Sequence, residues 1–298
     1  MKLSTPNRAG SPIQPVAITK KPNYKSHPRR PSLLIVAAIA ISGLLAASMG
    51  AKGQAPGDPG FWGTAANFAV ISYAGVTNTG PSVIEGNVAL SPTPSITGFP
   101  PGVVNGTIHY NDAEAVQARI DATAAYNTLA GLTPTANLTG VNLGTQTLTA
   151  GVYHFDSSAA LDGILTLNTL SDANAIFVFQ IGSTLTAGIG SQVVVTGAGA
   201  GIDANVFWQV GSSTTLMTNA EFFGNIISLA SDTLNTGANV ENGRVIALNG
   251  AVTLDSNEIN PSQVPEPSTW AMLFGGMGVG GFWTRMRCRS RRNRQGGL

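Results

Sequence analysis

Residues 215–254 read TLMTNAEFFGNIISLASDTLNTGANVENGRVIALNGAVTL. The dipeptide Thr-Leu occurs there at 215, 233 and 253, and Gly-X-(Ile/Val) occurs at 224 and 243, so both markers return after 18 to 20 residues. A short period built from β-forming residues indicates a solenoid with coils of three short strands and three corners. Stacked coils align equivalent side chains about 4.7–4.9 Å apart. The repeat therefore predicts a function carried by a flat repeated surface.

The same markers occur earlier in the chain. Thr-Leu begins at Thr147, Thr166 and Thr184, and Gly-X-(Ile/Val) begins at Gly86 and Gly106. Because side chains alternate along a strand, each leucine should point inward. One inward ladder is predicted to comprise Leu167, Leu185, Leu216 and Leu234. The more continuously apolar runs 176–180 and 206–210 predict one coil position used twice, with strands buried on both faces.

Residues 112–130 interrupt the β pattern and predict one amphipathic helix. Asn111 is the expected N-cap, with Glu114 completing a capping box, and Gly131 is the expected C-cap. The expected apolar stripe consists of Val116, Ile120, Ala124 and Leu129. Since the helix breaks the coil order, the coils around 64–108 must stack on coils that follow it.

The N-terminal region, residues 1–55, has the layout of an export signal. A basic stretch through Arg30 precedes an apolar run from Leu33 to Ala47, and small residues follow. Fifteen apolar residues are short for a stable membrane span. We therefore predict an exported chain whose body, residues 56–262, forms one β-solenoid domain.

The C-terminal region, residues 263–298, reads as a second signal. The motif Pro265, Glu266, Pro267 precedes an apolar segment from Trp270 to Trp283 and a dense arginine cluster. This order is typical of a marginal membrane segment held by a positive cytoplasmic tail. It also resembles the PEP-CTERM sorting signal of Gram-negative bacteria. That resemblance implies transient membrane association, exosortase recognition, tail removal and delivery to the cell surface or matrix; a permanent anchor is the alternative.

The charge distribution excludes a nucleic-acid-binding body. Of the 16 basic residues only Arg119 and Arg244 lie between the two signals, whereas 14 of the 15 acidic residues lie there, which gives a formal charge of −12. A basic footprint is therefore absent. The single cysteine, Cys288, lies in the C-terminal tail, so no disulfide is expected in the body.

The sequence gives little support for catalysis. His109 and His154 are the only histidines of the body, and we expect each to make a structural hydrogen bond. Asp156 and Asp162 have the chemistry of a glycosidase pair, but their Ser and Gly neighbours favour turn roles. No zinc spacing, P-loop, GxSxG or dinucleotide fingerprint occurs. We expect no catalytic residue, no metal and no cofactor.

Threonines beside the repeated leucines are the strongest functional signal. Outward pairs such as Thr184/Thr186, Thr215/Met217 and Thr233/Asn235 are short and uncharged. Ordinary β propensity explains any single pair, but the repetition favours a flat array. Methyl groups discourage ordinary hydration while hydroxyls anchor water, and the strand spacing of about 4.8 Å is close to repeat distances in ice.

Several collinear stretches between residues 61 and 260 resemble the microbial ice-binding protein family. They are 63–70 (GTAANFAV), 77–81 (TNTGP), 96–102 (ITGFPPG), 148–153 (LTAGVY), 179–183 (FQIGS) and 242–245 (NGRV). The resemblance implies a mainly β fold, namely a discontinuous right-handed triangular β-solenoid with one long α-helix packed alongside. It also implies a Thr-(Ala/Gly)-X-(Thr/Asn) motif, which matches Thr64–Asn67, Thr139–Asn142 and Thr236–Asn239 here.

We predict that one solenoid face binds ice. Its expected residues are Thr166, Thr184, Thr186, Thr215, Thr233, Asn235 and Thr253, with Thr236 and Asn239 at the border. Met217, Asp255 and Glu221 depart from an ideal flat, neutral surface. The competing strand set around Asn225, Ile227, Arg244 and Ile246 alternates bulky and charged groups, which makes it less suitable for ice binding.

The prediction is thus an extracellular or surface-bound monomer whose partner is the ice crystal surface, where it slows growth or recrystallisation. The alternative is a matrix or adhesion protein on the same fold, with exopolysaccharide as its partner. A polysaccharide-cleaving enzyme is a third reading, which the scarcity of basic residues in the body disfavours.

Overall fold

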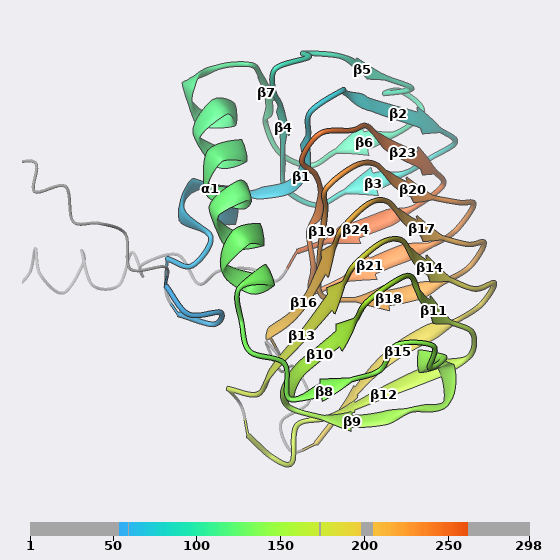
Figure 1. The fold of residues 1–298 in the computed structure, drawn as a ribbon. Coiled ribbons are helices and arrows are strands. Elements are labelled where there is room, and N and C mark those ends of the chain that lie inside the picture. The colour runs from blue at the N-terminus through green and yellow to red at the C-terminus, as the bar shows by residue number, and fades with distance from the viewer. Residues whose placement is uncertain (1–53, 59, 173, 198–204, 262–298) are drawn as a thin grey trace, which may run out of the picture. The chain divides into compact units, whose positions relative to one another are not determined.

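The computed structural model describes residues 54–58, 60–172, 174–197 and 205–261. These form three parallel β-sheets wound around a common core, with one long helix against one sheet (Figure 1). The predicted sorting signal, and the predicted export signal as far as residue 53, lie outside these described residues. The mainly β fold with one helix is confirmed.

Each complete coil contributes one strand to each sheet, whereas η2(Leu143–Thr145) takes the place of a sheet B strand between β8 and β9. Sheet A has the order β7(Ile108–Tyr110), β4(Asn87–Leu90), β1(Phe68–Ser72), β22(Val245–Ala247), β19(Asn225–Ser228), β16(Asn205–Val210), β13(Ile176–Ile181), β10(Gly151–Phe155), β8(Ala136–Asn137). Sheet B has the order β11(Ala159–Leu161), β14(Leu185–Ala187), β17(Thr214–Leu216), β20(Asp232–Leu234), β23(Val252–Asp255), β2(Val76–Thr79), β5(Ile96–Thr97). Sheet C has the order β6(Val103–Val104), β3(Val83–Ile84), β24(Glu258–Asn260), β21(Asn239–Glu241), β18(Glu221–Phe223), β15(Gln192–Thr196), β12(Ile164–Asn168), β9(Thr147–Thr149).

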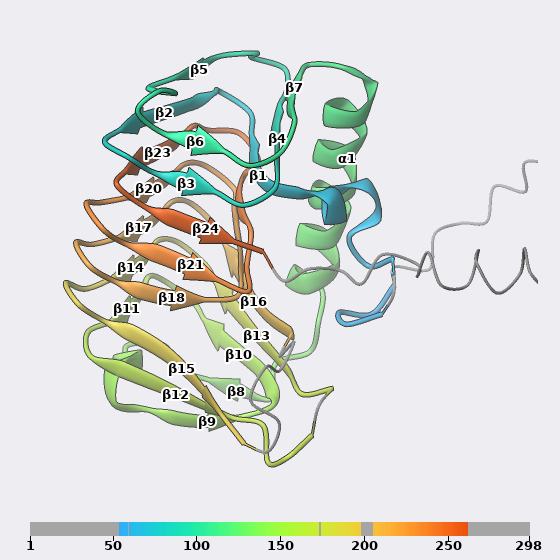
Figure 2. The same ribbon diagram turned by 180° about the vertical axis from the view of Figure 1, so that it is seen from behind.

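The stacking order differs from the chain order at one point. The last coil, β22-β23-β24, pairs with the first coil, β1-β2-β3, in all three sheets. Helix α1(Ala113–Ala130) carries the chain from the early coils to the opposite end of the stack (Figures 1 and 2). The predicted discontinuity is therefore confirmed, and the early coils close one end of the solenoid.

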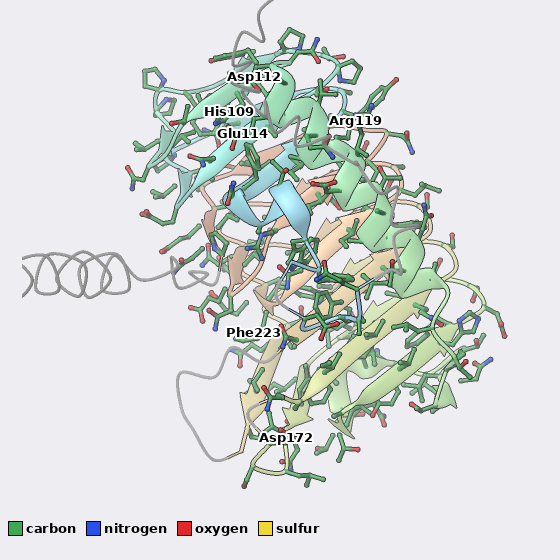
Figure 3. The ribbon with its side chains drawn as sticks, turned by 90° about the vertical axis from the view of Figure 1, so that its left-hand side faces the viewer. His109, Asp112, Glu114, Arg119, Asp172 and Phe223 are labelled. Carbon is green, nitrogen blue, oxygen red and sulfur yellow. The ribbon has the colours of Figure 1, made fainter. Side chains whose placement is uncertain are left out.

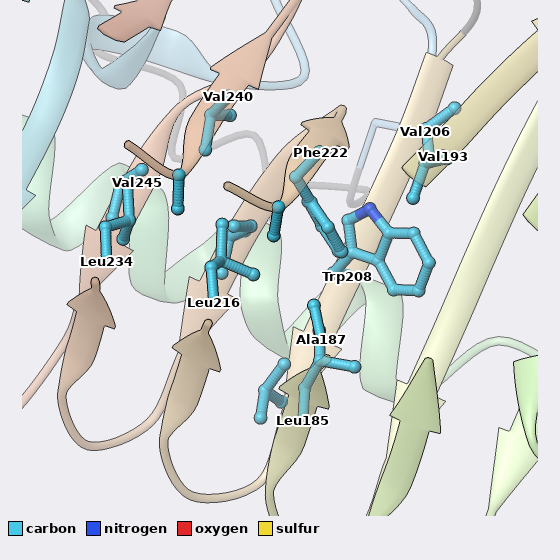
Figure 4. Packing of buried hydrophobic residues seen from close by; sticks show 14 of the residues in the cluster. Leu185, Ala187, Val193, Val206, Trp208, Leu216, Phe222, Leu234, Val240 and Val245 are labelled. Carbon is cyan, nitrogen blue, oxygen red and sulfur yellow. The ribbon is translucent and has the colours of Figure 1, made fainter. Parts of the chain in front are cut away.

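The core is a column of aromatic and aliphatic side chains between the sheets. Tyr153, Phe179 and Trp208 stack on successive strands of sheet A, with ring centroids 5.5 and 4.0 Å apart. Leu216 and Leu234 point from sheet B toward the same interior as Trp208 (Figure 4). Such stacking buries apolar area without a disulfide and fixes the coil register.

The strands β13 and β16 are buried on both faces, as the sequence predicts. They pair in register from Ile176↔Asn205 to Ile181↔Val210. Alternate residues face the core. The others, including Val178 and Phe207, face α1 and residues 61–67, which we call the N-terminal segment. Sheet A is therefore covered on its outer side.

Helix α1 differs from the prediction at its start and in its packing face. Asp112 is the N-cap and accepts a hydrogen bond from the Ala115 amide, 2.8 Å; Asn111 precedes it with φ +50°. The buried face consists of Ala115, Ala118, Ala122, Ala125, Tyr126 and Leu129. Val116 and Ala124 are not buried, and Ile120 is half-exposed. The small alanine side chains let the helix lie close to sheet A. This close packing decides which face is buried, although larger side chains lie on the other face. The predicted Gly131 C-cap is confirmed.

Two polar side chains of sheet A tie down the segments that cover it. Gln180 donates from Nε2 to the carbonyls of Leu129 and Leu132, 2.7 and 2.8 Å away, at the end of the helix. Arg244 donates to the Ala66 carbonyl of η1(Gly63–Asn67), 2.9 Å away, and lies 5.2 Å from the centre of the Trp62 ring. The helix and the N-terminal segment are thus fixed to the stack at separate points.

The Gly-X-(Ile/Val) marker is explained by close approach at the corner before sheet A. A Cβ on Gly243 would lie 1.8 Å from the Gly224 carbonyl oxygen, and a Cβ on Gly106 would lie 2.4 Å from the Gly86 carbonyl carbon. Only glycine permits these corners to stack at strand spacing.

Candidate functional site

The outer face of sheet B carries a single row of threonines. Register pairs place Thr186 beside Thr215, Thr215 beside Thr233, and Thr233 beside Thr253. The row then crosses to the early coils, where Thr253 pairs with Thr77 and Thr77 with Thr97. We call Thr97, Thr77, Thr253, Thr233, Thr215 and Thr186 the threonine column. Its five strand steps span about 24 Å.

The hydroxyls of the threonine column are available to solvent. Thr77, Thr97, Thr186 and Thr253 are exposed, and Thr215 and Thr233 are half-buried. No hydrogen bond formed within residues 54–261, as far as they are described, uses any of these six hydroxyls. The strands that carry the threonine column are paired with a neighbour on both sides, except β5, which lies at the edge of the sheet.

The rows flanking the threonine column differ in character. The row at the corner toward sheet A consists of small side chains. Its members are Ser158, Thr184, Ser213, Ser231, Ala251, Gly75 and Ser95. The row toward sheet C is irregular, and its members are Asp162, Gly188, Met217, Asn235, Asp255, Thr79 and Phe99. Asp255 accepts hydrogen bonds from Thr236 and Ser256, which hold its carboxylate toward the corner. The smoothest part of the face is therefore the threonine column with its serine-rich neighbour.

The other two sheets offer less suitable surfaces. Sheet A lies beneath the helix and the N-terminal segment, so Ile227 and Ile246 of the competing strand set are buried. Sheet C exposes glutamates on β24, β21 and β18 and apolar side chains on β15 and β12, namely Glu258, Glu241, Glu221, Val194 and Ile164. Sheet B is the solenoid face with a continuous uncharged row.

The structure divides the residues predicted for the ice face. Thr186, Thr215, Thr233 and Thr253 lie in the threonine column, and Asn235 and Thr184 lie in its two flanking rows. Thr166 lies in sheet C, paired with Thr147 and Val194, and Asn239 also lies in sheet C, paired with Glu221. Thr236 occupies the corner between the sheets. The prediction that Thr166 shares a row with the others is therefore wrong.

The leucine ladder requires a similar correction. Leu167, Leu185, Leu216 and Leu234 are all buried, as predicted. However, Leu216 pairs with Ala187 rather than Leu185, because β14 is shifted by two residues, and Leu167 belongs to sheet C. The aligned set is Leu216, Leu234 and Leu254.

Sequence reasoning missed Thr77 and Thr97, which the pairing of β2 with β23 adds to the column. Thr77 lies in the TNTGP stretch, but nothing in the sequence indicates which late strand it adjoins. None of the Thr-(Ala/Gly)-X-(Thr/Asn) motifs lies in the column. Thr64–Asn67 forms part of η1, and Asn142 caps η2(Leu143–Thr145).

Both histidines of the body make structural contacts. His109 lies with Asp112 and Glu114 at the N-terminal end of α1, with Nδ1 2.8 Å from Asp112 Oδ2 (Figure 3). The hydrogen bond from the Ala115 amide is the main cause that holds the pKa of Asp112 below its usual value, and the His109 side chain lowers it further. His154 Nε2 lies 3.1 Å from Asp156 Oδ1. Asp156 also accepts from Asn137 and Thr139, and Asp162 accepts from Asn142, so both aspartates fill the expected corner roles.

Within residues 54–261, over the parts that are described, His, Cys, Asp and Glu side chains form no cluster of three that would hold a metal ion. Over the same residues, no helix is both long and apolar enough to cross a bilayer.

Known proteins are similar to this chain in sequence and in fold. The sequence model of the family described as Ice-binding-like matches residues 70–260. An ice-binding protein from Nostoc sp. (strain HG1) is 52% identical over 225 residues, which cover 72% of this chain and 82% of that protein. An ice-binding protein from Flavobacterium frigoris (strain PS1) is 34% identical, with coverages of 67% and 76%.

Solved structures agree with the sequence comparisons. The crystal structure of an ice-binding protein from an Antarctic biological consortium has a TM-score of 0.65 and 45% identity, covering 70% of this chain and 92% of that one. The ice-binding protein of Antarctomyces psychrotrophicus has a TM-score of 0.63 and 40% identity, with coverages of 67% and 96%.

Proposed function

Because the chain belongs to the ice-binding-like family, we propose that it adsorbs to ice through the outer face of sheet B. The observation that carries this proposal is the register of the threonine column, six identical uncharged side chains on six consecutive strands. Repetition at strand spacing gives the surface a lattice of its own, about 4.8 Å between rows.

The mechanism requires no covalent chemistry. Threonine methyls exclude disordered water from the face, and the free hydroxyls hold the remaining water in a fixed array that joins the crystal. The backbone ladder keeps the array rigid, since each central strand is paired on both sides. An adsorbed protein then blocks addition of water at that place, and growth or recrystallisation slows.

Thr215, Thr233 and Thr253 form the centre of the proposed site, with Thr186 and Thr77 on either side. Asn235 and Thr184 flank them. Thr166, Asn239 and Thr236 are not part of it, because they lie on another sheet or at its corner.

We also propose that the protein is exported from a Gram-negative cell and that its C-terminal signal is removed. The order of motif, apolar segment and arginine cluster supports this, with Pro265, Glu266 and Pro267 as the sorting motif. The mass of the protein recovered from the producing cell's surface and medium tests it. The expected mass lacks residues near both ends, and a full-length mass in the membrane fraction contradicts it.

The function is tested by growing a single ice crystal in the purified protein. Ice binding predicts a faceted crystal, a gap between melting and freezing temperatures, and small grains after annealing of frozen sucrose solution. A round crystal and unrestrained grain growth would overturn the proposal. Retention of the same protein on immobilised exopolysaccharide would then favour a matrix role.

A further inference from the structure

A buried polar cluster lies beneath the threonine column, at the corner between sheets A and B. Asp232 begins β20 and points inward, where it is fully buried. Its Oδ1 accepts a hydrogen bond from the Ser228 hydroxyl at the end of β19, 2.5 Å away, and the Ser228 hydroxyl lies 2.7 Å from that of Thr214 in β17. All three residues have no exposed surface. The cluster therefore joins three strands of two sheets.

Among the described residues, no basic side chain forms an ion pair with Asp232. No residue of β17, β19 or β22, which adjoin β20, is titratable. The fourth neighbour, β23, carries Asp255, whose carboxylate is held at the outer corner by Thr236 and Ser256. Asp232 Oδ2 has no hydrogen-bond partner among the described residues. A carboxylate in this position is costly, and the neutral acid costs less because it buries no charge.

The position of the cluster links it to the proposed ice face. Asp232 and Thr214 immediately precede Thr233 and Thr215, which present their side chains on the opposite side of the same strands. Any movement that brings water to Asp232 must therefore shift the start of β20 or β17. Central members of the threonine column would move with it.

We propose that the Asp232–Ser228–Thr214 cluster is a proton-dependent latch, which holds the threonine column flat while Asp232 is protonated and loosens it when the proton is lost. The structural part stands on the cluster alone, and the consequence for ice rests on the proposed function. The latch acts by local opening at the corner, since the coils on either side remain paired.

The direction of the pH effect follows from burial. Burial raises the pKa of Asp232 from its usual value near 4 to about 8 in the folded chain. Between these values the folded state keeps a proton that the unfolded state has released, so stability falls as pH rises through this window. Above about pH 8 the folded protein itself ionises, and the latch opens.

Other buried groups titrate outside this range. Desolvation lowers the pKa of Arg244 only to about 10, and burial raises the pKa of Tyr126 from 10. Measurements between pH 6 and 9 therefore isolate Asp232 from these two groups.

Asp232→Asn supplies a matched variant in the full chain. The amide has the same shape, its Oδ1 accepts from Ser228, and it stays neutral at every pH. Asp255→Asn, on the next strand of the same sheet, controls for loss of one carboxylate. We expect thermal hysteresis of the native protein and of Asp255→Asn to fall at least twofold from pH 6 to pH 9, while that of Asp232→Asn stays constant. Equal pH profiles for native protein and Asp232→Asn would overturn the latch.

Amide hydrogen exchange gives a readout that does not depend on ice. Between pH 7 and 9 the amides of residues 231–234 should exchange faster in the native protein than in Asp232→Asn, after correction for the intrinsic pH dependence. Amides of β13 should be the same in both. This result with no ice activity at any pH would retain the latch and reject the proposed function. Identical exchange at residues 231–234 in both proteins would reject the latch.

Discussion

At the residue scale, threonine combines the two properties that the sheet B face requires. Its branched side chain favours the strand conformation and restricts χ1, so methyl and hydroxyl hold fixed positions. Its hydroxyl is short enough to leave the row level. The six hydroxyls of the threonine column form no hydrogen bond among the described residues, whereas the nearby Thr184 donates to Ser158. The free hydroxyls thus distinguish the threonine column from Thr184 in the neighbouring row.

The buried side of the same strands supplies the stability that keeps this face flat. Leu216 is fully buried between Ala187 and Leu234. Leu216→Ala should lower the free energy of unfolding by about 2–5 kcal/mol, because transfer energy is lost and a cavity remains. Thr215→Ala, one residue away on the outer side, should change it by less than about 0.5 kcal/mol. Urea unfolding measures both, and equal values would contradict the inward assignment.

The sequence predicts which residues alternate inward and outward, but it does not predict register. Thr184-Leu185 and Thr215-Leu216 look equivalent, yet Thr215 pairs with Thr186. A shift of two residues leaves the inward and outward faces unchanged, so the hydrophobic pattern does not reveal it. Thr166 is misplaced for a different reason: coils differ in length, and a step of 18 residues from Thr166 to Thr184 leads from sheet C to sheet B.

At the scale of elements, α1 acts as a cover for sheet A. Its alanines lie against the outward residues of the central strands in one apolar cluster. The cover removes sheet A from solvent and leaves sheets B and C as the exposed faces. The sequence pattern predicts this helix to within one residue at each end. Its packing face was not predictable from side-chain size, because the sheet beneath it selects close approach.

The helix face can be tested with a pair of identical substitutions. Ala122 is fully buried against sheet A, whereas Ala124 is exposed. Ala122→Leu should destabilise the fold by about 1–3 kcal/mol through overpacking. Ala124→Leu should be nearly neutral. Thermal unfolding followed by circular dichroism gives both values, and a larger loss for Ala124→Leu would restore the face predicted from sequence.

At the scale of the whole molecule, the proposed ice face is assembled from two distant parts of the chain. Thr77 and Thr97 come from the coils before α1, and the other members of the threonine column come from the coils after it. The first coil pairs with the last in every sheet. The early coils thus extend the row and also cover strand edges that would otherwise be unpaired.

This arrangement predicts the limits of the folded domain. A 56–262 fragment should be soluble, monomeric, β-rich and cooperative in unfolding, since the solenoid lies within it. A 111–262 fragment should aggregate, because β22, β23 and β24 become open edges. Size-exclusion chromatography and circular dichroism distinguish the two. A stable monomeric 111–262 fragment would show that the early coils are not needed to close the stack.

The most direct test compares the same substitution on two faces. Thr233 lies at the centre of the threonine column, and Thr166 is a half-buried outward threonine between two leucines on sheet C. Thermal hysteresis should fall strongly in Thr233→Tyr, because the ring lifts the face from the ice lattice, and should be unchanged in Thr166→Tyr. Both variants should keep the native unfolding temperature. Full hysteresis in Thr233→Tyr with loss in Thr166→Tyr would contradict the assignment of ice binding to sheet B.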